Sequence, residues 1–250
     1  MVSVPPPATP AESPRSAQPQ PIRANTVLPA RREEVMLDTA DGERLTGALA
    51  LPAAADPVAT LVCLHPLPTH GGSTDSHLLR KLDQRMPALA DLAVLRFNTR
   101  GTAGSTGHFD GGDGERWDLA AALDLVEARD LPAPWWVGWS FGTELALRHG
   151  TDPTIVGAIL LAPPLHRATD ADLDRWAASG KPVVVIVPEF DDYLRPDAAH
   201  ERFGRIPQAQ VIAVPRARHL FVGHAEAVFD EIARAVVPRS FPLPRAWPVP

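Results

Sequence analysis

Residues 138–142 read Gly138-Trp139-Ser140-Phe141-Gly142, a G-x-S-x-G pentapeptide. An apolar run, residues 135–137, precedes it, and residues 143–150, which follow it, have helical spacing and end at a glycine. Strand, sharp turn and helix in this order lift a serine hydroxyl out of a sheet and hold it as a strained nucleophile. The glycines suit such a turn, because a side chain at 138 or 142 would collide with the neighbouring strand or helix. The pattern therefore nominates Ser140 as a nucleophile.

The pentapeptide alone leaves a second interpretation open. Two glycines and a serine at these offsets occur by chance in many chains of this length. The same residues can form a glycine-lined turn with an ordinary serine at the start of a helix. The rest of the chain decides between the two.

Composition and charge favour one soluble domain. The chain has 250 residues, of which 45% are hydrophobic, and a net charge of -6, which is enough for a single α/β domain with a large core. The acidic balance argues against a nucleic-acid partner. The lone cysteine, Cys63, excludes an intrachain disulfide, and its apolar neighbours predict a buried thiol. Since no apolar run approaches the roughly 18 residues of a spanning helix and no signal peptide is evident, we expect a cytoplasmic protein that does not bind membranes.

Proline-rich segments flank the predicted domain. Residues 1–30 are rich in Pro, Ala and Ser, and such a segment buries too little apolar surface to offset its ordering entropy, so we predict a disordered tail. Residues 31–237 form the predicted domain. Residues 238–250 are again dense in proline but carry Phe241, Leu243 and Trp247, which would let this tail lie as a strap on the surface.

Between these tails, predicted strands and helices alternate. Asp41-Gly42 marks a hairpin between residues 33–39 and 44–52, and the continuous apolar run 60–66 is typical of a strand buried on both faces. An antiparallel start followed by repeated β-α units predicts an α/β fold with a mostly parallel central sheet and helices on both faces. The other predicted strands are residues 93–99, 135–139, 156–162, 182–187 and 210–215. The predicted helices are residues 76–89, 115–129, 143–150, 171–178, 197–203 and 224–235.

The loops that follow the predicted strands supply the partners that a serine nucleophile needs. In such sheets, function gathers at the carboxyl ends of the strands. A serine hydroxyl needs a base, and the base needs an orienting carboxylate. Asp191 and Asp192 follow one buried strand, and His219 follows the last strand. The order Ser140, Asp191, His219 is the order of the triad in the α/β-hydrolase fold.

From residue 33 to about residue 237, the chain resembles a compact α/β-hydrolase. It is similar to a bacterial group of small, mostly uncharacterised hydrolases related to dienelactone hydrolases. The segments that carry the resemblance are residues 64–72, 95–101, 105–107, 112–115 and 138–142. One position departs from the pattern, since Leu67 stands where many relatives have a second histidine. The segment between residues 162 and 182 holds only a short helix, so we expect no large lid domain and an open site.

The resemblance implies a Ser-His-Asp triad. Ser140 would attack a carbonyl carbon, His219 would take its proton and return it to the leaving group, and Asp191 would hold the imidazole tautomer. Asp191 and Asp192 both remain candidates for the acid, with Asp191 favoured by the family pattern. His224 competes with His219 as the base, but it is expected to begin the last helix.

The resemblance also implies an oxyanion hole and a pocket. The backbone N–H groups of Phe141 and Leu67 would bind the oxyanion, since Pro66 has no N–H to give. Trp139 is expected in the pocket wall, although it could instead pack beneath the sharp turn at residues 138–142. The predicted pocket residues are Trp139, His65, Phe190 and Leu165, with Trp176 as a further candidate, and His65 would orient the oxyanion loop.

Two other groups of polar residues have competing interpretations. His65, His70 and His77 lie close in sequence, but no Cys or carboxylate pattern completes a metal site, so we expect no metal. Arg96 and Arg100 could bind a substrate carboxylate, but a structural ion pair behind the turn at residues 138–142 is the favoured interpretation.

The sequence thus predicts a serine hydrolase, without a cofactor, that cleaves a carboxylic ester or thioester of a small-molecule acyl substrate through an acyl-enzyme intermediate. Two alternatives stay open. One is a non-catalytic protein of this fold that binds a ligand or a partner. The other is the same triad in a peptidase, an acyltransferase or a carbon–carbon hydrolase.

Overall fold

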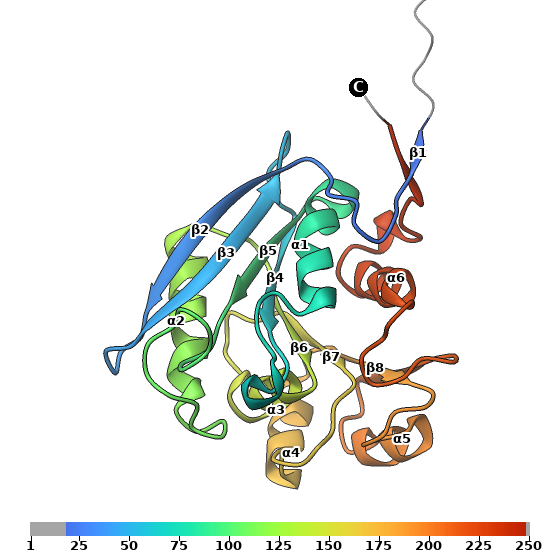
Figure 1. Ribbon diagram of the computed structural model, residues 1–250. Helices are drawn as coiled ribbons and strands as arrows, with labels where there is room; N and C mark the ends of the chain where they lie inside the picture. Colours follow the sequence, from blue (N-terminus) through green and yellow to red (C-terminus); the bar gives the residue numbers. More distant parts are fainter. Residues whose placement is uncertain (1–18, 249–250) are drawn as a thin grey trace, which may run out of the picture.

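A twisted eight-stranded sheet forms the centre of the computed structural model, which describes residues 19–248 (Figure 1). The strand order is β2-β3-β5-β4-β6-β7-β8-β9. The pairs β2-β3 and β3-β5 are antiparallel and all later pairs are parallel. The strands are β2 (Ala30–Asp38), β3 (Arg44–Pro52), β4 (Ala59–Leu64), β5 (Leu92–Phe97), β6 (Pro134–Trp139), β7 (Gly157–Leu161), β8 (Val183–Pro188) and β9 (Ala209–Val214).

Helices cover both faces of this sheet (Figure 1). The buried side chains fall into two clusters, one on each face. Helices α1 (His77–Ala90) and α6 (Ala225–Val236) contribute to one cluster. The other cluster draws on α2 (Glu115–Ala128), α3 (Phe141–His149), α4 (Asp170–Ser179) and α5 (Pro196–Phe203). The predicted α/β fold, with its antiparallel start and helices on both faces, is confirmed.

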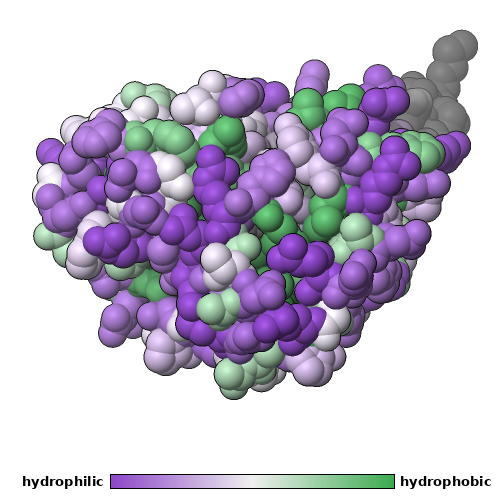
Figure 2. Space-filling view, turned by 90° about the horizontal axis from the view of Figure 1, so that it is seen from below, coloured by the Kyte–Doolittle hydropathy of each residue, from purple (hydrophilic) through white to green (hydrophobic). Residues whose placement is uncertain are grey.

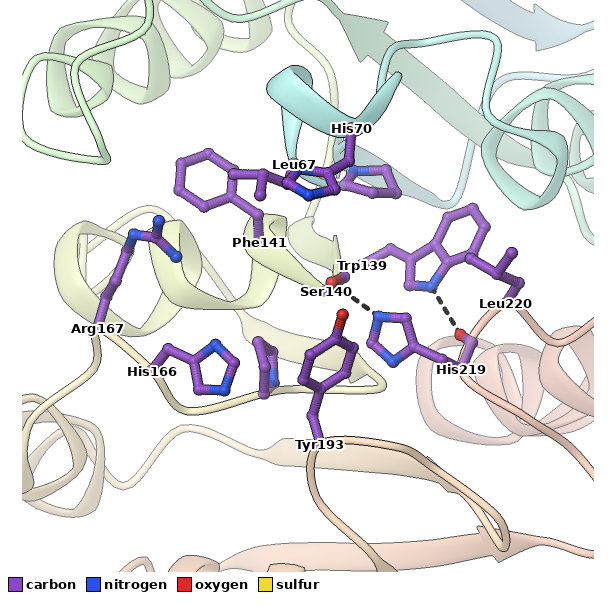
Figure 3. Close-up of a pocket in the computed structure, with 12 residues that line it drawn as sticks. Leu67, His70, Trp139, Ser140, Phe141, His166, Arg167, Tyr193, His219 and Leu220 are labelled. Carbon is purple, nitrogen blue, oxygen red and sulfur yellow. Dashed lines mark hydrogen bonds between the residues drawn. The ribbon is translucent and has the colours of Figure 1, made fainter.

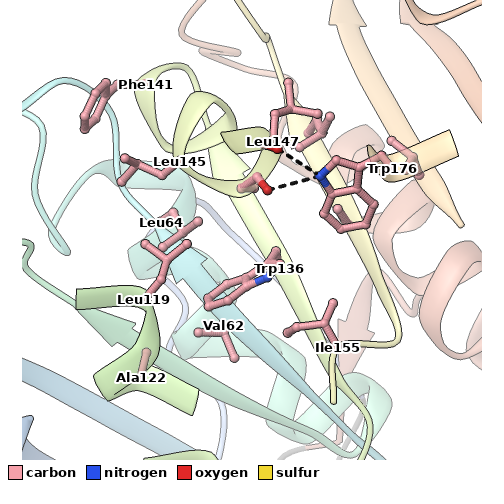
Figure 4. Close-up of a cluster of buried hydrophobic side chains, with 14 of the residues drawn as sticks. Val62, Leu64, Leu119, Ala122, Trp136, Phe141, Leu145, Leu147, Ile155 and Trp176 are labelled. Atoms are coloured by element: carbon pink, nitrogen blue, oxygen red, sulfur yellow. Dashed lines mark hydrogen bonds between the residues drawn. The ribbon is translucent and has the colours of Figure 1, made fainter. Parts of the chain in front are cut away.

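The core explains why the central strands read as continuous apolar runs. Every residue of β4, β6 and β8 is buried, because helices cover them on both sides. Cys63 is among them, and burial raises the pKa of its thiol to about 12. Trp176 on α4 is also fully buried, and its indole N–H points at the carbonyls of Ala146 and Leu147 (Figure 4). Trp176 is therefore a core residue and not part of a pocket wall.

The predicted elements match the observed ones, with small shifts at their ends. The largest is in β2, which begins at Ala30 instead of residue 33. Between β7 and β8, the described chain forms one helix, α4, and no lid domain, as predicted.

Both ends of the described chain meet beside α6. Strand β1 (Gln20–Pro21) pairs antiparallel with β10 (Ala246–Trp247), after the short 3₁₀ turn η2 (Pro238–Ser240). The strap expected for the C-terminal segment is present, and Leu243 is its buried residue. Residues 1–18 of the tail predicted to be disordered lie outside the described residues.

The remaining part of that tail, residues 19–30, packs against the domain. The side chain of Arg85 on α1 is 2% exposed, and its Nη2 donates to the carbonyl of Arg23 at 2.7 Å. A buried guanidinium needs acceptors, and this one finds them in the N-terminal segment. The folded unit therefore begins before the predicted boundary at residue 31.

The turn between β6 and α3 has no space for side chains at its two glycines. A Cβ on Gly142 would lie 2.1 Å from the Leu64 carbonyl oxygen of β4, and one on Gly138 would lie 2.5 Å from the Gly142 oxygen. Both obstacles are backbone atoms, so the neighbouring strand or helix would have to move. The expectation that side chains at 138 and 142 collide with their neighbours is confirmed.

We expect Gly142→Ala to lower the free energy of unfolding by about 3 kcal/mol or more, because α3 must move off the sheet. Denaturant unfolding followed by circular dichroism measures this. Gly204→Ala is the matched control, since Gly204 has φ -56° and its Cβ would lie 3.1 Å from the nearest atom. Equal effects of the two substitutions would contradict this account of the turn.

Candidate active site

Ser140 lies on the sharp turn between β6 and α3 and has a strained backbone. Its φ is 53° and its ψ is -114°, a combination that non-glycine residues rarely adopt. The Ser140 N–H donates to the Leu161 carbonyl at 2.9 Å, and its carbonyl accepts from the Thr143 hydroxyl at 2.6 Å. These bonds hold the strained residue with its side chain at the carboxyl ends of the strands, the site expected for function in such sheets.

Two loops bring His219 and Asp191 to this serine. His219 follows β9 and Asp191 follows β8. His219 Nε2 lies 2.9 Å from Ser140 Oγ (Figure 3), and His219 Nδ1 lies 2.8 Å from Asp191 Oδ2. The three side chains thus form one continuous chain of hydrogen bonds.

The environment of Asp191 fixes its charge and its direction. Its side chain is 1% exposed, and its Oδ1 accepts from the N–H groups of Tyr193 and Leu194 at 2.8 and 3.1 Å. Burial acts to raise the pKa of Asp191, but the hydrogen bonds from His219 and from the two N–H groups outweigh it, so the pKa lies below its usual value. Asp192 is exposed, and the hydrogen bond to His219 Nδ1 is made by Asp191.

This arrangement selects one tautomer of His219. An ionised carboxylate only accepts hydrogen bonds, so His219 Nδ1 must donate to Asp191. In the neutral imidazole, Nε2 is then the acceptor, and it faces the hydroxyl of Ser140. His224, the competing histidine, is the N-cap residue of α6, directly before its first residue.

A cavity of about 250 Å³ opens beside Ser140. Figure 2 looks from below in Figure 1, onto the loops that follow the strands, and shows apolar residues gathered in the middle of a mostly hydrophilic face. Trp139 lines the cavity, as predicted, together with Leu67 and Phe141, the residues predicted to bind the oxyanion. Trp139 is both packed and part of the pocket wall. It is only 2% exposed, and its indole still borders the cavity. The full lining is Pro66, Leu67, His70, Trp139, Ser140, Phe141, Pro164, His166, Arg167, Tyr193, His219 and Leu220.

His65 is not in the cavity wall, so that part of its prediction is wrong. It is 1% exposed and lies beneath the loop after β4. Its Nδ1–H donates to the Pro66 carbonyl at 2.7 Å, and its Nε2 accepts the Thr99 N–H at 3.1 Å. These bonds join the loop that carries Leu67 to the end of β5, so His65 does have the loop-orienting position that the sequence suggested.

The burial of His65 makes the stability depend on pH. Desolvation lowers the pKa of His65 to about 4, whereas an unfolded histidine titrates near about 6.5. The neutral imidazole therefore stabilises the fold above pH 6.5, and this contribution is lost as the pH falls toward 4. We expect the stability difference between wild type and His65→Gln to shrink by about 2 kcal/mol from pH 7 to pH 5. Urea unfolding at both pH values measures it, and a constant difference would contradict the assignment.

Phe190 and Leu165 are also absent from the cavity wall. Phe190 is 40% exposed on the surface, and Leu165 turns toward the core cluster that includes α3 and α4. Both are in the predicted loops but are not among the residues that line the cavity. Neighbours in the same loops take their places: Tyr193, His166 and Arg167.

Arg96 and Arg100 are structural, which agrees with the favoured interpretation. Arg100 lies between Asp41 and Asp118, each at 2.8 Å. Arg96 pairs with Asp83 at 3.2 Å. Both arginines are nearly buried, and their partners satisfy the charge.

The three histidines that are close in the sequence lie in different environments in the structure. His65 is buried, His70 lines the cavity, and His77 Nε2–H donates to the Leu220 carbonyl at 2.7 Å. Within residues 19–248, no group of three or more His, Cys, Asp and Glu side chains is placed to hold a metal ion. None of the helices in that range has the length and apolar character of a membrane-spanning segment.

Comparisons with known proteins support the fold described above. No family model matches the chain. An α/β serine hydrolase without a lid from Xanthomonas campestris, XC6422, superimposes with a TM-score of 0.70 and 28% identity, over 87% of this chain and 99% of that one. An α/β serine hydrolase homologue from Coxiella burnetii gives a TM-score of 0.70 over 82% and 97% of the two chains, and its 24% identity supports the fold only.

A curated relative covers a shorter part of the chain. It is an uncharacterized protein of Rickettsia prowazekii, 28% identical over 152 residues, which are 59% of this chain and 63% of that protein. The match therefore spans less than two thirds of the relative's length. Taken with the sheet topology and the absence of a lid domain between β7 and β8, these likenesses identify the chain as a small, lidless protein of the α/β-hydrolase fold, similar to α/β serine hydrolases of known structure.

Proposed function

We propose that the protein is a serine hydrolase that cleaves a carboxylic ester or thioester through an acyl-enzyme on Ser140. The observation that carries this proposal is the hydrogen-bonded chain from Asp191 through His219 to Ser140, with contacts of 2.8 and 2.9 Å. It ends at a serine that borders a cavity large enough for a small acyl group. The similarity to serine hydrolases adds independent support.

In the first half-reaction, Ser140 Oγ attacks the carbonyl carbon and its proton moves to His219 Nε2. The imidazolium that forms is stabilised by Asp191 through Nδ1–H. The tetrahedral intermediate then collapses. Its bond to the leaving oxygen or sulfur breaks, the Nε2 proton goes to that atom, and the acyl group stays on Ser140.

In the second half-reaction, water takes the place of the leaving group. His219 Nε2 removes a proton from the water, and the oxygen attacks the acyl carbon. The collapse returns the proton to Ser140 Oγ and releases a carboxylic acid. No redox or metal step is needed for this sequence to balance.

Two backbone N–H groups would bind the oxyanion in both halves. Phe141 is the first residue of α3, and the first N–H groups of a helix have no partner within it. Leu67 lies in the loop after β4, and both residues line the cavity beside Ser140. Each such donor typically contributes about 2.7–4 kcal/mol to transition-state stabilisation.

A fluorophosphonate probe tests the proposal, because it phosphonylates only an activated serine. We expect labelling of wild type, loss of labelling in Ser140→Ala, and unchanged labelling in Ser240→Ala, a serine in the C-terminal segment. A folded wild type that takes no label would instead favour the non-catalytic alternative.

A further inference from the structure

The cavity beside Ser140 has a positive charge without an acidic counterpart in its wall. Arg167 lines it together with His70 and His166, and none of the described residues in its lining is Asp or Glu. This is unusual in a chain with a net charge of -6. A pocket with one sign of charge concentrates ligands of the opposite sign.

The loop that carries Arg167 is clamped by a buried carboxylate. Glu144 on α3 is fully buried. It accepts the backbone N–H groups of His166, Arg167 and Ala168 at 2.6, 3.1 and 2.6 Å. The carboxylate is thus used by the backbone of the loop, and it does not face the cavity. The position of Arg167 is therefore set by the same helix that begins beside Ser140.

The guanidinium of Arg167 is held without being neutralised. Its Cζ lies over the Phe141 ring, 5.3 Å from the ring centre, in a cation–π contact. Other arginines nearby on the surface, Arg148, Arg175 and Arg202, pair with aspartates. Within residues 19–248, Arg167 takes part in no ion pair, so its N–H donors remain available to a ligand.

The two sides of Ser140 differ in character. Figure 3 shows His219 and Leu220 on one side of Ser140, and Arg167 and Phe141 on the other. The leaving group must lie on the His219 side, because His219 returns the proton to it. An acyl chain on the opposite side would then extend over Phe141 toward Arg167.

We propose that the acyl group of the substrate ends in a carboxylate, as in a half-ester of a short dicarboxylic acid, and that Arg167 binds this carboxylate. The inference rests on the proposed function, since it assigns the acyl side of the same site. A guanidinium matches a carboxylate with two parallel N–H···O bonds. Arg167 lies outside the sequence segments that carry the family resemblance.

Matched esters test the proposal. The 4-nitrophenyl half-ester of glutaric acid and 4-nitrophenyl valerate differ only by a carboxylate in place of a methyl group. We expect wild type to prefer the half-ester. Arg167→Met should lower kcat/KM for the half-ester about 10- to 100-fold while changing the valerate value less than about threefold. Arg202→Met, the loss of a surface arginine on α5, should change neither.

Two further measurements keep the result decisive. Arg167→Lys keeps the charge but not the planar fork, so it should recover part of the preference. In wild type alone, the preference for the half-ester should fall as ionic strength rises, because salt screens the attraction.

The two proposals fail in different ways. Equal kcat/KM for both esters in wild type, or an equal loss on both in Arg167→Met, would overturn the carboxylate assignment and leave the hydrolase standing. A wild type that hydrolyses neither ester and takes no fluorophosphonate label would overturn both.

Discussion

Replacing Ser140 with alanine is expected to lower kcat for ester hydrolysis by about 10⁶-fold, the scale seen when a triad nucleophile is removed. In the proposed mechanism, the substitution takes away the only atom that forms a covalent bond to the acyl group. The backbone bonds to Leu161 and Thr143 that hold the turn do not involve the hydroxyl of residue 140. Steady-state hydrolysis of a 4-nitrophenyl ester measures the change, and circular dichroism and thermal unfolding check the fold.

The substitution should remove activity while leaving the turn and the cavity in place. Alanine at residue 140 keeps the positive φ, so a small loss of stability is expected, but the cavity and His219 remain. If Ser140→Ala retained more than about a tenth of the wild-type kcat, the nucleophile would have to be sought elsewhere.

Asp191→Asn is expected to lower kcat by about 10⁴-fold, although the two side chains have nearly the same shape. The N–H groups of Tyr193 and Leu194 can only donate, so the carbonyl oxygen of the new amide must face them. Its NH₂ group then faces His219 Nδ1. That nitrogen must now accept, which puts the imidazole proton on Nε2. His219 can no longer take the proton of Ser140.

The adjacent aspartate is the control for this effect. Asp192 is exposed and makes no contact of this kind with His219, so Asp192→Asn should leave kcat within about twofold of wild type. Kinetics of both variants on one ester decide the matter. A greater loss in Asp192→Asn would reverse the assignment of the acid.

The sequence was sufficient for the fold because local patterns and burial agree along the chain. Runs such as that of β8, which consists of valine, isoleucine and proline, are buried on both faces and have no other stable environment in a domain of this size. The role of Gly138 and Gly142 could also be predicted from the sequence. Backbone atoms of Gly142 and Leu64 leave no space for a side chain at these two positions.

The cavity wall was harder to predict, because it depends on which side chain of a loop turns inward. Leu165 has φ 51°, and this turn points it to the core while the next two residues border the cavity. The loop around Asp191 shows the same effect. Phe190, which was predicted to line the cavity, lies on the surface, and Tyr193 lines the cavity instead. The spacing of Tyr193 from Asp191 was visible in the sequence, but its contact with the His219 ring, at 4.7 Å between centroids, was not. Arg167 belongs to no motif that was recognised in the sequence. Only its position over the Phe141 ring in the structure draws attention to it.

Mass spectrometry of a quenched reaction tests whether Ser140 forms the acyl-enzyme. Wild type is mixed with excess 4-nitrophenyl valerate, stopped in acid within the first turnover, and digested. We predict a mass increase of one valeryl group on the peptide that contains Ser140, and none in Ser140→Ala. Release of 4-nitrophenol without any acylated peptide, or with the valeryl group on another residue, would contradict the proposed mechanism.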